Sequence, residues 1–154
     1  MKRQVILSFF FFLIWLTAVS QERPSVYIDA STDSVYHHKT IDYLNEQVIP
    51  KCNLGSLPTW TEEYGAPRSL TFLFKIQINS EGKIVSVITD KAEISYRNTK
   101  GKTVKEPIKG EPFCSRIGNC YREGILNLKK LNTLMLNDAN VNTEVPFVVR
   151  WEGI

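Results

Sequence analysis

Three cysteines are the residues of this chain best suited to covalent chemistry: Cys52, Cys114 and Cys120. Their spacing is neither the Cys-x-x-Cys of a thiol oxidoreductase nor a zinc-ligand pattern, so we interpret them as structural. Three disulfide pairings are possible, and the sequence does not choose among them. We favour Cys114–Cys120, because Gly118 and Asn119 would let the short segment between them turn back, with Cys52 buried or unpaired.

Other reactive side chains lack the partners that catalysis or metal binding would need. His37 and His38 are adjacent, so they face different directions, and no third ligand is marked nearby; an exposed polar pair is expected rather than a metal site. Glu62 and Glu63 have no spaced partner acid of the glycosidase kind. Ser115 has no nucleophile-elbow context. The sequence therefore predicts a protein that is not an enzyme and holds no metal or cofactor.

Apolar and basic residues are concentrated at the amino terminus. The chain has 154 residues, of which 43% are hydrophobic, and a net charge of +3. The first twenty residues hold fourteen of the hydrophobic side chains, two basic groups and no acid, so the rest of the chain carries +1. So balanced a charge argues against a nucleic-acid partner. The remaining 134 residues are too apolar for a disordered chain and suit one domain.

The first twenty residues have the three-part layout of a secretory signal peptide. Residues 1–4 include two basic side chains, residues 5–19 are almost continuously apolar, and Ala18-Val19-Ser20 offers small residues for cleavage. We therefore expect a periplasmic or secreted protein. The alternative is a retained inner-membrane anchor with the domain facing the periplasm, the one case in which membrane contact is expected. Cleavage is favoured because the apolar run is shorter than the roughly 20 residues that span a bilayer.

The chain after the signal segment begins with a polar stretch and a short helix. Residues 21–39 are expected to form a loose arm. Ile41, Leu44 and Val48 then recur at intervals of three and four, which predicts the buried stripe of a helix. Pro50 disfavours helical backbone at the residue before it, so the helix should end there.

A β-hairpin is the clearest pattern in the chain. Residues 70–78 alternate between apolar and polar side chains, which predicts a strand with one buried face. Residues 79–82 have turn composition, and Gly82 can adopt a positive φ. Residues 83–90 return as the second strand. The apolar face of the first strand consists of Leu70, Phe72, Phe74, Ile76 and Ile78.

The segment 91–120 is a polar insert. Within it, Gly101-Lys102 could turn a smaller hairpin between residues 94–96 and 103–104. A helix is expected over residues 121–135, with Ile125, Leu128 and Leu131 on one side.

The last segment, residues 141–151, alternates again and predicts a closing strand. Pro146 cannot donate to a sheet ladder, which indicates an edge position or a bulge. The order helix, strand, strand, helix, strand predicts a compact α+β domain over residues 40–154. Its small antiparallel sheet, the hairpin plus the closing strand, would be covered by one or two helices.

Three stretches resemble the carboxy-terminal domain of TonB-type proteins, especially the stand-alone versions of Bacteroidota. Residues 43–50 are similar to the family's helix-then-proline entry, residues 72–87 to its strand, acidic-Gly turn and strand, and residues 141–151 to its closing strand. The resemblance covers roughly residues 40–154. The chain departs from the family at residues 131–137, where a Trp-x-Pro-Gly element is usual, and in the length of the insert.

The resemblance implies a non-enzymatic peptide- or protein-binding module of the periplasm or envelope, linked to outer-membrane transport. The family's domain recognises short extended segments of outer-membrane transporters, and a sheet edge can do so by adding a strand. The partner would be such a transporter or another envelope protein, with Arg150 contacting an acidic peptide. The candidate binding residues are Thr143, Val145, Phe147, Val149 and Arg150.

Two other hypotheses about the function stay open. One is a membrane-anchored TonB-like component of an energy-transducing transport system. The chain lacks a Pro-rich arm and a His in its apolar segment, which favours the module instead. The other is a purely structural secreted domain, in which the closing strand only completes the core and Arg150 is solvated.

Overall fold

The computed structural model describes residues 25–52, 67–108, 112–128 and 130–152. The predicted signal segment and the loop with Glu62 and Glu63 lie outside the described residues. The elements are, in chain order, β1 (Ile28–Asp29), η1 (Ala30–Thr32), α2 (Ser34–Val48), η2 (Ile49–Cys52), β2 (Pro67–Ile78), β3 (Ile84–Arg97), β4 (Thr103–Pro107), α3 (Pro112–Leu126), β5 (Met135–Leu136), β6 (Ala139–Asn140) and β7 (Thr143–Glu152).

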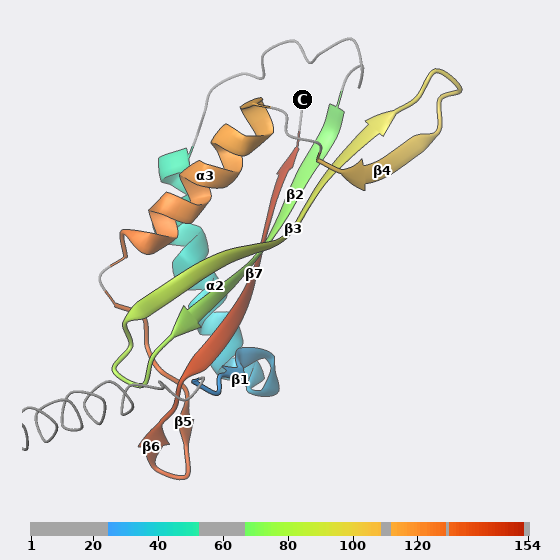
Figure 1. Ribbon diagram of the computed structural model, residues 1–154. Coiled ribbons are helices and arrows are strands. Elements are labelled where there is room, and N and C mark those ends of the chain that lie inside the picture. The colour runs from blue at the N-terminus through green and yellow to red at the C-terminus, as the bar shows by residue number, and fades with distance from the viewer. Residues whose placement is uncertain (1–24, 53–66, 109–111, 129, 153–154) are drawn as a thin grey trace, which may run out of the picture.

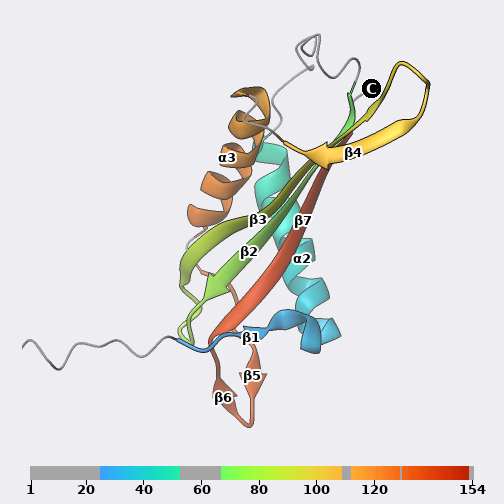
Figure 2. The ribbon, with the colours of Figure 1, turned by 45° about the vertical axis from the view of Figure 1, so that its right-hand side comes forward.

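The main sheet has five strands in the order β1-β7-β2-β3-β4, and the two helices cover one of its faces (Figure 1). β7, β2, β3 and β4 are antiparallel neighbours, whereas β1 is parallel to β7. The sheet is strongly twisted, so β4 lies at a steep angle to the lower half of β7 (Figure 2). The predicted α+β class is thereby confirmed.

The core lies between the helices and the alternating apolar face of the sheet. The strand face predicted for residues 70–78 is buried as expected, and odd-numbered residues of β7 continue it. Phe72 and Phe74 stack with ring centroids 6.1 Å apart, and Tyr121 of α3 packs against Phe72. The hairpin and the closing strand therefore bury one common face, as the alternation predicted.

α2 begins earlier than the apolar stripe alone suggests. Its N-cap is Asp33, whose carboxylate accepts the backbone N–H of Tyr36 at 2.9 Å. Thr40, Leu44 and Val48 form its buried face. Much of the predicted loose arm is consequently regular structure, because β1, η1 and the first turns of α2 all precede residue 40.

α3 occupies a different stretch from the predicted helix of residues 121–135. It runs from Pro112 to Leu126, and its buried stripe is Ile117, Tyr121 and Ile125. Gly118 lies against the ring of Phe72, where even a Cβ would come within 3.0 Å. The helix therefore packs closely on the sheet at Gly118, a residue type that had suggested a turn at this position.

The disulfide joins Cys52 to Cys120, with Cα atoms 5.7 Å apart, so the predicted Cys114–Cys120 pairing is wrong. Both of those residues lie in α3, six positions apart. At about 1.5 Å of rise per residue, they are separated by roughly 9 Å along the helix axis, beyond the reach of a disulfide. The bond instead ties the end of η2 to α3.

The insert extends the hairpin. β3 continues to Arg97, and β4 pairs with it through the predicted turn, in which Gly101 has φ +71. The segment after α3 forms a second, two-stranded sheet, β5–β6, with positive φ at Asn137 and Asp138. No helix among the described residues has the length and apolar character needed to cross a bilayer.

Candidate functional site

Four of the five predicted binding residues face the core. Thr143, Val145 and Phe147 are fully buried and Val149 nearly so, because odd-numbered residues of β7 point toward α2 and α3. Arg150 points to the opposite face and is exposed. The strand therefore offers a partner its backbone edge and its even-numbered side chains rather than its apolar ones.

The edge of β7 that faces away from β2 is mostly uncovered by strands. β7 pairs with β2 along its whole length, from Thr143 to Glu152. On the other side β1 pairs only with Thr143 and Glu144. Within the described parts of the chain, no strand pairs with this side of residues 145–152, as Pro146 led us to expect.

The backbone groups on this edge can be assigned from one hydrogen bond and the strand register. The carbonyl of Asn142 accepts the N–H of Ile28 in β1 at 2.9 Å. In an antiparallel strand, each residue directs its N–H and C=O to the same side, and alternate residues face alternate sides. The register between β7 and β2 has no shift, so the residues whose backbone faces outward are Glu144, Pro146, Val148, Arg150 and Glu152.

The first part of this edge is closed by α2. The Nε2 of His37 lies 3.3 Å from the carbonyl oxygen of Pro146, close enough for the ring N–H to donate to it. Pro146 itself has no N–H. The available outward groups thus begin at Val148 and continue through Arg150, for which no described strand supplies partners.

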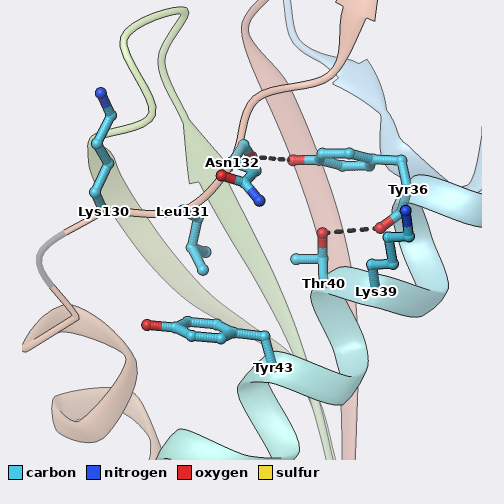
Figure 3. Close-up of a pocket in the computed structure, with 7 residues that line it drawn as sticks. All are labelled: Tyr36, Lys39, Thr40, Tyr43, Lys130, Leu131 and Asn132. Atoms are coloured by element: carbon cyan, nitrogen blue, oxygen red, sulfur yellow. Dashed lines mark hydrogen bonds between the residues drawn. The ribbon is translucent and has the colours of Figure 1, made fainter.

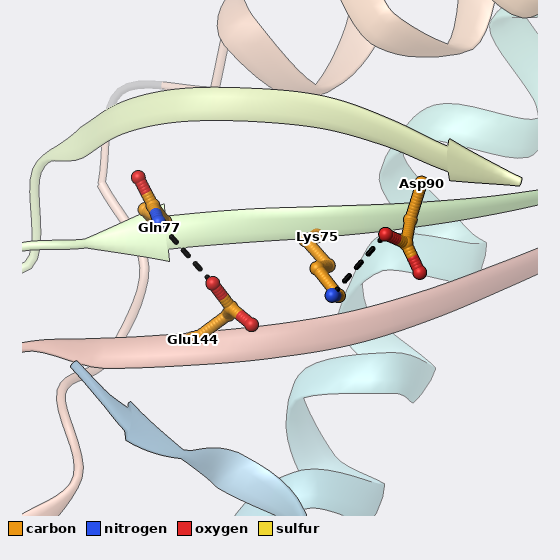
Figure 4. Close-up of polar contacts among 4 residues, drawn as sticks. All are labelled: Lys75, Gln77, Asp90 and Glu144. Atoms are coloured by element: carbon orange, nitrogen blue, oxygen red, sulfur yellow. Dashed lines mark hydrogen bonds and ion pairs between the residues drawn. The ribbon is translucent and has the colours of Figure 1, made fainter.

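The sheet face next to this edge is polar. Lys75 pairs with Asp90 at 3.2 Å, and the Gln77 side-chain amide donates to Glu144 at 3.2 Å; all four side chains lie on the face away from the helices (Figure 4). Arg150 pairs with Glu152 at 3.0 Å, with both side chains largely exposed. Exposed pairs of this kind add little stability, so a ligand can reorganise Arg150 at small cost.

A hollow of about 380 Å³ lies between α2 and the segment 130–132 (Figure 3). The Tyr36 hydroxyl donates to the carbonyl of Asn132, and the Thr40 hydroxyl donates to the carbonyl of Tyr36. Burial raises the pKa of Tyr36, which keeps its hydroxyl protonated. These groups hold the segment against α2 and do not form a nucleophile with a base. The lining consists of Tyr36, Lys39, Thr40, Tyr43, Lys130, Leu131 and Asn132.

The histidine pair has structural partners. His38 Nδ1 lies 2.9 Å from the carbonyl of Ser34, one turn earlier in α2, while His37 contacts Pro146. No group of three His, Cys, Asp or Glu side chains that could hold a metal occurs among the described residues. Ser115 lies on an exposed part of α3.

Comparison with protein-family models, curated proteins and solved structures finds no match for this chain. The candidate site therefore rests on the geometry of β7 and its neighbours.

β1 and His37 contribute to this site without leaving a local signal in the sequence. β1 is only two residues long, so it leaves no periodic signal, yet it determines which part of the β7 edge is covered. His37 was expected to be solvated, but its ring contacts the carbonyl of Pro146, 109 positions away in the sequence. Pro146 alone signalled the edge.

Proposed function

We propose that this chain is a non-enzymatic binding module of the cell envelope, which holds an extended peptide segment of a protein partner by strand addition to β7. The observation that carries the proposal is the outward side of β7 from Val148 onward. It presents backbone donors and acceptors in strand geometry, and no described strand pairs with them. A peptide adding to such an edge gains main-chain hydrogen bonds regardless of its sequence.

The surroundings of this edge favour a short peptide segment over edge-to-edge self-association. Uncovered edges are an aggregation hazard that proteins limit with prolines and charges. Here Pro146 and His37 close one end, and the Arg150–Glu152 pair lies at the other. The usable stretch is thus short, matching a segment of about five residues, the common length of a strand.

The proposed partner and compartment rest on the sequence of the amino-terminal segment and on the resemblance of residues 40–154 to TonB carboxy-terminal domains. A cleaved signal peptide would place the module in the periplasm or outside the cell. The partner we propose is an outer-membrane transporter or another envelope protein. The membrane-anchored alternative requires residues 1–20 in the mature protein, so the intact mass of the exported chain separates the two.

The experiment is peptide selection followed by a matched pair of edge variants. Peptides are selected from a random heptamer library on the purified full chain in a non-ionic detergent. Val148→Pro removes the outward N–H without breaking the ladder with β2, whereas Val148→Thr keeps the N–H and changes only the exposed side chain. The selected peptides should bind Val148→Thr almost as well as the parent and Val148→Pro roughly tenfold more weakly.

Two results would exclude strand addition at β7. One is a set of selected peptides that bind Val148→Pro as tightly as the parent chain. The other is a library that yields no binder at all, which is the outcome expected of a purely structural domain. Far-ultraviolet circular dichroism of both variants shows whether the sheet is intact before binding is compared.

A further inference from the structure

A second hollow, of about 240 Å³, lies on the sheet face opposite the helices, where β7, β2, β3 and β4 run side by side. The strand register explains its make-up. Ser69 is paired with Ser95, and Ser95 with Lys105, while the next row brings Arg150, Thr71 and Glu93 together. The lining consists of Ser69, Thr71, Glu93, Ile94, Ser95, Lys105, Val148 and Arg150.

Two hydroxyls at the floor of this hollow are buried without partners. Ser69 and Ser95 are 4% and 8% exposed, and neither hydroxyl makes a hydrogen bond within the described part of the chain. The other two buried polar residues differ, because Thr40 donates to the carbonyl of Tyr36 and Thr143 to that of Val141. Buried hydroxyls are ordinarily satisfied, so this pair is the exception that calls for a ligand.

The charges around the two hydroxyls sum to an excess of one cation. Arg150 is paired with Glu152, and Glu93 is paired with Lys91 at 2.9 Å. Lys105 has no acidic partner among the described residues. A ligand that accepts hydrogen bonds from the hydroxyls and carries one negative charge would complete the set.

The geometry points to a carboxylate-binding site at this hollow, in which Ser69, Ser95 and Lys105 bind the carboxylate oxygens and Arg150 lies at the rim. A carboxylate is favoured over phosphate because Glu93 also lines the hollow and would repel a second negative charge. Ser69 lies on β2, one strand in from β7, and Ser95 lies on β3, two strands in. The site therefore adjoins the strand-addition edge, with which it shares Val148 and Arg150, but it does not require a peptide at that edge.

The test is a titration of the ¹⁵N-labelled full chain with sodium acetate, with sodium chloride at equal ionic strength as the control. The amide signals of Ser69, Ser95 and Lys105 should shift saturably with acetate and not with chloride. Lys105→Gln should weaken acetate binding roughly tenfold, since a charged hydrogen bond is lost. Lys100→Gln, at an exposed lysine of the β3–β4 turn, should leave it unchanged.

The two serines allow a second test, which distinguishes a binding role of their hydroxyls from a structural one. Replacing both hydroxyls, in Ser69→Ala/Ser95→Ala, should raise the urea midpoint of the acetate-free protein, because two unsatisfied buried groups are removed. The same variant should lose acetate binding. The site is ruled out by shifts that rise linearly with acetate, by equal shifts in Lys105→Gln, or by tighter binding of inorganic phosphate than of acetate.

Discussion

His37 and Pro146 meet at the point where the outward edge of β7 begins: the imidazole Nε2 lies 3.3 Å from the proline carbonyl oxygen. This contact joins α2 to β7 across 109 positions of sequence. It satisfies the carbonyl of a residue that has no N–H, so a peptide adding to β7 would lose nothing by starting after it. The available edge is thereby defined as Val148 onward.

Two glycines with the same backbone conformation should differ in their tolerance of a side chain. Gly82 and Gly101 have φ of +85 and +71. A Cβ at Gly101 would meet nothing, so Gly101→Ala should lower the free energy of unfolding by about 1 kcal/mol, from backbone strain alone. A Cβ at Gly82 would collide with the carbonyl oxygen of Leu131, and Gly82→Ala should cost about 3 kcal/mol. Urea unfolding of both variants measures the difference, and equal losses would contradict the packing of residue 131 on the turn.

The disulfide should contribute substantially to stability. Cys52 and Cys120 are 68 positions apart, so the bond removes considerable freedom from the unfolded chain. Cys52→Ser should therefore lower the free energy of unfolding by about 4 kcal/mol. Urea unfolding with and without reductant measures this.

Cys114→Ser is the matched control. It should leave the disulfide in place, and reductant should destabilise this variant as much as the parent chain. Peptide mapping without reductant that found Cys114 joined to Cys120 would overturn the pairing and the position of α3.

Tyr121, which is buried, and Tyr36, which is partly buried, should make the fold sensitive to alkali. Burial raises the pKa of Tyr36 and of Tyr121 above the usual 10.0. The unfolded chain therefore loses these protons at a lower pH than the folded protein. The stabilisation from the two protonated tyrosines is therefore complete below pH 10.0. It is lost as the pH rises through their folded-state pKa values.

Replacing each tyrosine by phenylalanine separates the stability that comes from its hydrogen bond from the stability that depends on its ionisation. At about pH 8, Tyr36→Phe should cost about 1 kcal/mol, since its hydroxyl donates to Asn132, and Tyr121→Phe should cost less. Near pH 11, both variants should lose stability less steeply than the parent. A parent and variants that fall in parallel above pH 10.0 would contradict the burial of these rings.

Asp33, the residue immediately before α2, should stabilise the helix through its side-chain oxygen. Asp33 caps the helix by accepting the N–H of Tyr36. Asp33→Ala should lower the free energy of unfolding by about 1 kcal/mol, whereas Asp33→Asn keeps a capping oxygen and should lose only a fraction of that. Equal losses in the two variants, measured by thermal unfolding, would show that the cap does not hold α2.

Periodic segments of this chain were predictable from the sequence, and segments governed by tertiary contacts were not. The alternation of residues 70–78 and 143–151 gave the buried sheet face, since a strand with one covered face must alternate. α3 was misplaced because Gly118 reads locally as a turn residue, while its small size is what lets the helix approach Phe72. The Cys114–Cys120 prediction failed for the same reason: a supposed loop proved to be helix.

The candidate site was predictable only in part. Pro146 indicated an uncovered edge, and Arg150 an exposed side chain, because both follow from local chemistry. The burial of Val145 and Phe147 follows from the same alternation that identified the strand, so their side chains serve the core. The contact of His37 with Pro146 and the pairing of Ser69 with Ser95 depend on register across the sheet, which no local pattern encodes.

Amide hydrogen exchange of Val148 and Arg150 is the sharpest test of whether the outward edge of β7 receives a peptide strand. In the ligand-free protein these two amides should exchange roughly a hundredfold faster than those of Phe147 and Val149, which bond to β2. A peptide selected on the full chain should slow Val148 and Arg150 to the rate of their neighbours and leave Phe147 and Val149 unchanged. Exchange at Val148 and Arg150 that is already slow without peptide, or that stays fast when the peptide is bound, would rule out strand addition at this edge.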